Sequence, residues 1–189
     1  WDTSPNQTDS FATSLSSGVY MVRVIDAIGC QAALNVTISE PTELVSSLQV
    51  TNLLCNSICN GSATAIVLGG TSPYSYNWND PGNQTNLTAN GLCSGNTDLV
   101  ITDNNGCTTT DTATISEPSQ LSMSLSGINI SCNSLCDGIA TANAVGGTTP
   151  YQYQWNDPLS QTTTSATGLC SGTYAIAVTD SNGCVANSS

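Results

Sequence analysis

Residues 69–81 read Gly-Gly-Thr-Ser-Pro-Tyr-Ser-Tyr-Asn-Trp-Asn-Asp-Pro, and residues 146–158 repeat them with three changes. The offset between the two copies is 77 residues. Extending the alignment outward pairs residues 52–107 with 129–184 without a gap, and 32 of the 56 positions are identical. Trp1-Asp2 stands one further offset before Trp78-Asn79. A fixed period of this kind indicates an array of structural repeats.

The joints between units recur as well. Ile-Ser-Glu-Pro occupies residues 38–41 and again residues 115–118. We therefore divide the chain into the C-terminal part of one repeat (1–44), a complete repeat (45–121) and a repeat lacking its last residues (122–189). Because the chain begins within a unit, we expect it to be an excerpt from a longer array.

The apolar pattern predicts strands. Tyr20, Val22 and Val24 share one face at a spacing of two, as do Thr97, Leu99 and Ile101 in the next unit. No segment has the apolar stripe and caps of a helix. About seven short strands per unit, separated by Gly, Pro, Asn and Asp turns, predict tandem immunoglobulin-like antiparallel β-sandwiches, an all-β fold. The predicted core anchors are the recurring aromatic residues Trp78, Trp155, Tyr74, Tyr76, Tyr151, Tyr153, Tyr20 and Tyr174.

The charge balance excludes several kinds of function. The chain has 13 acidic side chains, one basic side chain (Arg23) and no histidine. Nucleic acid is not expected as a partner, because phosphate binding needs a basic surface. No apolar run is long enough to span a membrane, so membrane insertion is not expected either. Without His or Lys the usual catalytic bases and amine nucleophiles are missing, and we expect no enzymatic activity.

Nine cysteines in units of this size predict disulfide staples and an oxidising, extracellular setting. The first part-unit has Ser16 at the position of Cys93 and Cys170 but keeps Cys30 at the position of Cys107 and Cys184, so these two positions are not expected to pair with each other. We predict Cys55–Cys107 and Cys132–Cys184 as one type of bridge. Cys59–Cys93 and Cys136–Cys170 form the other type. Crossed pairing, Cys55–Cys93 with Cys59–Cys107, stays open, and Cys30 is expected to pair upstream of the residues given.

Metal sites are weaker interpretations. Zinc at Cys55 and Cys59 is disfavoured because the remaining cysteines are isolated and no histidine exists. An oxygen-only calcium site near a joint is conceivable, with Asp103, Asp180 and Glu117 as candidate ligands, although no calcium-loop motif is present. Acids at turns are the simpler interpretation, and we expect no cofactor.

Taken together, the Cys-Asn-Ser-x-Cys, Gly-Gly-Thr-x-Pro-Tyr-x-Tyr-x-Trp and Ser-Glu-Pro motifs resemble the SprB-type repeat, and the resemblance covers essentially the whole chain. Such repeats stand in tandem in very large surface adhesins of Bacteroidota. The resemblance implies a β-sandwich repeat of a bacterial cell-surface filament, exported by the type IX route and used in adhesion or gliding. Asp111-Thr112-Ala113 is similar to the O-glycosylation signal of that phylum, which makes Thr112 a glycosylation candidate.

The expected partners are neighbouring repeats of the same chain, other copies in a filament, and surface glycans. Three alternatives to a structural and adhesive segment stay open. The first is a repeated carbohydrate-binding module, which needs an exposed aromatic platform. The second is an accessory segment of a secreted hydrolase. The third is a self-assembling fibre subunit that uses strand donation.

Overall fold

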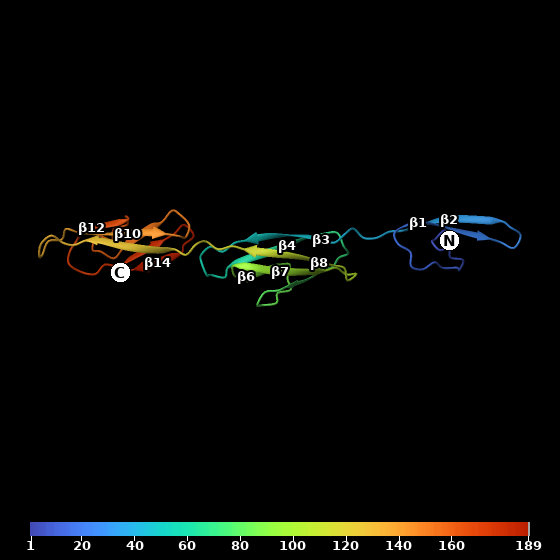
Figure 1. Cartoon of the computed structure of the whole chain (residues 1–189), viewed down its shortest axis with the longest axis horizontal. Coiled ribbons are helices and arrows are strands. Elements are labelled where there is room, and N and C mark those ends of the chain that lie inside the picture. The colour runs from blue at the N-terminus through green and yellow to red at the C-terminus, as the bar shows by residue number, and fades with distance from the viewer. Residues whose placement is uncertain (189) are drawn as a thin grey trace.

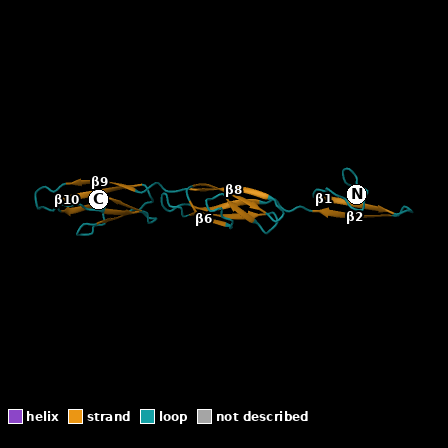
Figure 2. Ribbon diagram, turned by 90° about the horizontal axis from the view of Figure 1, so that it is seen from below, coloured by secondary structure: helices purple, strands orange, loops and turns teal. Residues whose placement is uncertain are grey.

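The structure, a computed structural model, describes residues 1–188. Strands and loops make up this whole range, and no helix occurs within it (Figure 2). Figure 1 shows three groups of strands in a row along the long axis. The all-β prediction and the antiparallel sheets are confirmed.

Residues 1–44 contain one antiparallel hairpin, β1 (Gly18–Ile25) and β2 (Gln31–Ile38). The middle unit contains β3 (Val45–Thr51), β4 (Gly61–Leu68), β5 (Ser75–Trp78), β6 (Thr88–Leu92), β7 (Gly95–Thr102) and β8 (Thr108–Ile115). The last unit contains β9 (Ser122–Ile128), β10 (Gly138–Val145), β11 (Gln152–Trp155), β12 (Ser165–Leu169), β13 (Ile176–Thr179) and β14 (Val185–Ser188).

The middle unit is a sandwich of two three-stranded sheets, ordered β3-β4-β6 and β5-β7-β8. The last unit repeats this order as β9-β10-β12 and β11-β13-β14. This order agrees with the A-B-E and C-F-G strands of an immunoglobulin-type sandwich. Strands β3 and β8, the first and last of the middle unit, both run toward the joint with the last unit.

Each sandwich is filled around one tryptophan. Trp78 is fully buried among the small residues Ala63, Ala65 and Ala89, together with the larger Leu99 and Ile101. Its indole nitrogen donates a hydrogen bond of 2.9 Å to the carbonyl of Asn86, which satisfies the polar atom that burial would otherwise leave unpaired. Trp155 has the same environment in the last unit and donates to the Thr163 carbonyl at 3.0 Å.

The number of strands differs from the prediction, with six in place of about seven in the middle unit. The residues after Trp78 form a loop instead of a strand, because Asp80 captures amide groups that a strand would offer to its neighbour. Its carboxylate accepts hydrogen bonds from the amides of Gly82 and Gln84 at 2.9 and 2.8 Å. The Gln84 side chain then reaches the backbone of Asn90. Asp157 and Gln161 build the same loop in the last unit.

Candidate functional site at the joint between units

A disulfide crosses the joint between the middle and last units. Cys55, which follows β3, is bonded to Cys184, which precedes β14, at a sequence separation of 129 residues. Strands β3 and β14 therefore belong to different sandwiches that are covalently joined outside the main chain.

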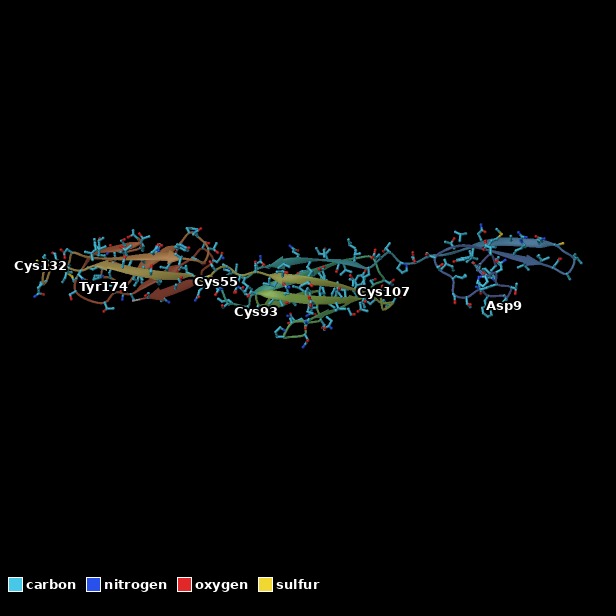
Figure 3. The ribbon with its side chains drawn as sticks, viewed as in Figure 1. Asp9, Cys55, Cys93, Cys107, Cys132 and Tyr174 are labelled. Atoms are coloured by element: carbon cyan, nitrogen blue, oxygen red, sulfur yellow. A yellow bond between two sulfur atoms is a disulfide. The ribbon has the colours of Figure 1, made fainter. Side chains whose placement is uncertain are left out.

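The predicted bridges Cys55–Cys107 and Cys132–Cys184 are wrong. Strand β3 leads from the preceding linker to Cys55, whereas β8 leads away from Cys107 to the following linker, so the two cysteines lie at opposite ends of the sandwich (Figure 3). A strand of this length separates its ends by roughly 20 Å. A disulfide needs Cα atoms within about 7 Å.

The second pair of bridges forms as predicted. Cys59 is bonded to Cys93 and Cys136 to Cys170, each across 34 residues within one unit. The crossed pairing and the zinc interpretation are therefore excluded for these cysteines. Within residues 1–188 the cysteines that stay free are exposed: Cys30, Cys107 and Cys132.

Hydrogen bonds accompany the bridge across the joint. The Asn182 side chain donates to the backbone carbonyl of Leu54 at 2.9 Å and to the Thr148 hydroxyl at 3.1 Å. It thus ties the turn before Cys184 both to its own unit and to the preceding one. A groove of about 310 Å³ runs along this contact, and its lining includes Cys55, Ser57, Leu121 and Cys184.

The loop after Cys55 also holds the linker between the units. Asn56 donates its side-chain amide to the Pro118 carbonyl at 3.2 Å, and the Ser57 amide donates to the Glu117 carboxylate at 2.7 Å. The Ser-Glu-Pro linker is therefore fixed against the unit that precedes it. Short linkers that contain proline bend little even when they are free.

The Gly-Gly pair of the repeated motif holds the same linker from the other side. Gly147 donates its amide to the Ser119 carbonyl at 2.8 Å. A Cβ on Gly146 would stand 2.0 Å from the Gln120 carbonyl oxygen, and its φ is +78°. Only glycine permits both this approach and this backbone conformation. The Tyr151 hydroxyl closes the turn by donating to the Gly146 carbonyl at 2.6 Å.

Asp180 organises the turn that presents Cys184. Its carboxylate accepts the amides of Thr148, Asn182 and Cys184 at 2.8, 2.9 and 2.9 Å. Burial pulls the pKa of Asp180 upward, but these amide bonds outweigh it and hold that pKa below its ordinary value. In the middle unit Asp103 accepts the corresponding amides, and the Thr71 amide has the largest influence in lowering the pKa of Asp103.

The calcium candidates are engaged in other contacts. Asp103 and Asp180 use their oxygens to accept backbone amides, and Glu117 accepts the Ser57 amide. Among residues 1–188, no three His, Cys, Asp or Glu side chains gather as a metal site would require.

The remaining predicted site residues lie apart from the joint. Tyr74, Tyr76, Tyr151, Tyr153 and Tyr174 are partly buried and pack against the tryptophan cores. Tyr20 is half-buried in β1, and its hydroxyl donates to the Ser16 carbonyl, as that of Tyr174 does to the Cys170 carbonyl. Thr112 is exposed on β8, and its hydroxyl donates to Asp98 at 2.7 Å.

The comparisons with known proteins agree with this repeated architecture. The family model described as the SprB repeat matches residues 47–83 and 128–160. The chain contains two SprB repeats. Each match begins near the first strand of a unit and ends just beyond the tryptophan-containing motif. No curated protein matches the chain significantly.

SprB repeats are structural repeats of large extracellular surface adhesins and are not an enzyme family. The disulfides fit that extracellular location. A search of residues 1–188 for a helix long and apolar enough to cross a membrane found none.

Proposed function

We propose that the chain is a segment of the stalk of an adhesin on a bacterial cell surface, in which SprB repeats hold an adhesive part away from the cell. The observation that supports this role most directly is the joint. Its linker is held from both sides, and the Cys55–Cys184 bridge adds a second covalent connection. A joint of this kind resists both bending and separation, which a stalk under tension requires.

The test is small-angle X-ray scattering of the oxidised chain beside the Cys55→Ser variant. We expect the oxidised chain to scatter as a rod and the variant to show a broader distribution of distances, while both retain the Cys59–Cys93 bridge. Equal flexibility of the two proteins would argue against a stiff stalk. Attachment of coated beads to surfaces then tests adhesion itself, and gliding needs the same variant in cells.

A glycan-binding role has one supporting observation. A shallow groove of about 420 Å³ in the last unit is lined by Tyr151, Gln152, Tyr153 and Gln154, with Thr162 and Thr179. Aromatic rings beside amide side chains suit a sugar. Against this role, Trp78 and Trp155 are buried and offer no stacking face. A glycan array probed with the chain and with Tyr153→Ala distinguishes the two functions.

A self-assembling fibre is the other alternative. The hairpin β1-β2 has no facing sheet within residues 1–44, and its apolar side chains Val24 and Leu34 are 63% and 66% exposed. A donated strand from a second copy would cover them. Sedimentation of the reduced and oxidised chain over a range of concentrations tests this, because strand donation depends on concentration and not on the disulfides. We propose neither calcium nor another cofactor for any of these roles.

A further inference from the structure

The cysteine pairing obeys a rule that extends beyond the one joint seen here. Cysteines at the positions of Cys59 and Cys93 pair within a unit, in both units. The cysteine at the position of Cys55 pairs with the one at the position of Cys107 in the next unit, since Cys184 lies 77 residues after Cys107. Under this rule the partners of Cys30, Cys107 and Cys132 fall outside residues 1–189, and these are the three free cysteines.

The surroundings of Cys107 are built like those of the bonded Cys184. The Cys107 amide donates to Asp103 at 2.8 Å, as the Cys184 amide donates to Asp180 at 2.9 Å. Asn105 donates to the Thr71 hydroxyl, as Asn182 donates to the Thr148 hydroxyl. The middle unit therefore presents the same turn toward the first unit that the last unit presents to Leu54 and Cys55.

The surroundings of Cys132 match those of the bonded Cys55 in the same way. Ser57 and Ser134, each two residues after the cysteine, both have a left-handed backbone with φ of 59° and 67°. The Leu54 amide donates to Asn60, and the Ser131 amide donates to Asp137. In each loop the second cysteine is already fixed by its own bridge within the unit.

We propose that Cys107 and Cys132 are the two halves of further joint disulfides, each taking the matching cysteine of an adjoining SprB repeat, and that Cys30 is a half of the same kind. Every joint of an array is then cross-linked. Each bridge forms from two thiols, which release two protons and pass two electrons to the disulfide of a thiol–disulfide oxidoreductase. That disulfide becomes a dithiol as the new bridge closes.

Such bridges shorten the covalent route along the array. Between Cys30 and Cys55 lie β2, a linker and β3, a path of 25 residues that is already extended. From Cys55 the route crosses to Cys184 and skips the residues between them. Cys107 and Cys132 delimit an equivalent path through β8, the next linker and β9. Fully stretched, 25 residues span about 85 Å, whereas two unbridged repeats would span about 500 Å. A bridged array therefore lengthens little even when its sandwiches unfold.

The experiment duplicates residues 45–121 within the chain, directly after residue 121. The inserted unit carries the exposed changes Thr51→Ser and Thr108→Ser as mass labels. Free thiols are alkylated, and the protein is mapped by mass spectrometry without reduction. We expect Cys107 of the inserted unit to be bonded to Cys55 of the original unit, while Cys107 of the original unit stays free. The same residue would thus be bonded only when a unit with a free Cys55 precedes it.

The matched control is Cys55→Ser in the original unit alone, which should free Cys107 of the inserted unit and leave both Cys59–Cys93 bridges intact. Those two bridges report that the units are folded. The proposal is overturned if Cys107 of the inserted unit is alkylated, or is bonded to Cys55 of its own unit, in a protein that contains both Cys59–Cys93 bridges.

Discussion

The Asn182 side-chain amide lies 2.9 Å from the backbone carbonyl of Leu54, a residue 128 positions earlier and in another sandwich. Its counterpart Asn105 makes the same bond within its own unit, 2.9 Å to the Thr71 hydroxyl, but has no such partner across a joint. The two asparagines therefore separate what the turn contributes to its own unit from what it contributes to the joint.

The first prediction concerns this pair. Asn182→Ala removes one hydrogen bond across the joint, and such a bond contributes about 0.5–1.5 kcal/mol. In glutathione buffers we expect the Cys55–Cys184 bridge of this variant to be reduced about two- to tenfold more readily than in the parent chain. Asn105→Ala, the matched control, should leave that equilibrium unchanged. Equal shifts in the two variants would mean that the Leu54 contact contributes nothing to the joint.

The second prediction concerns the close approach of the linker. Gly146→Ala places a Cβ against the Gln120 carbonyl, so both a steric clash and a left-handed backbone oppose it. We expect a loss of at least about 2–3 kcal/mol in the free energy of unfolding of the last unit. Gly183→Ala is the control, since its φ is +84° but nothing lies within 4 Å of the added carbon. It should cost only about 1–2 kcal/mol in backbone strain. Urea unfolding followed by tryptophan fluorescence measures both variants.

The third prediction concerns acid. The pKa values of Asp80, Asp103, Asp157 and Asp180 are lowered in the folded chain by hydrogen bonds to their carboxylates. The unfolded chain then binds more protons, so this stabilisation is complete above the ordinary aspartate pKa of about 3.9 and is lost as the pH falls through the folded values. We expect urea midpoints to be level from pH 7 to 5 and to fall below about pH 4. Asp180→Asn should lower the midpoint at pH 7 and reduce the further loss at pH 3. A midpoint that rises on acidification would contradict this account.

The fourth prediction concerns the bridges within units. Closing a loop of 34 residues stabilises a unit by about 3–4 kcal/mol in the chain-entropy model. Replacing Cys59 and Cys93 together by alanine should therefore destabilise the middle unit by about 2–4 kcal/mol and leave the last unit unchanged. The same double change at Cys136 and Cys170 is the matched control and should have the opposite pattern. Calorimetry resolves the two units if they unfold separately, and one common transition would instead show that the joint couples them.

The sequence contained most of the fold but not the joint. Strand alternation, the recurring Trp78 and the Gly-Gly turn predict the sandwich because they depend on neighbours along the chain. The bridge from Cys55 to Cys184 depends on the order in which whole units stack, which no local pattern encodes. One available signal was missed. If β3 leads away from one joint and β8 leads into the next, Cys55 and Cys107 must lie at opposite ends of their sandwich.

The last prediction concerns extension under force, with the chain held at its two ends in an optical trap. While Cys55–Cys184 is intact, unfolding of the strands between these residues adds no length, because the bridge keeps the two Cα atoms 5.7 Å apart. In the double variant Cys55→Ser with Cys184→Ser that segment opens, although the bridges Cys59–Cys93 and Cys136–Cys170 still retain 34 residues each. The segment that remains free should add about 200 Å at roughly 3.5 Å per residue. Steps of that size in the oxidised parent chain would mean that the joint bridge does not form, and their absence from the variant would mean that the units resist force without it.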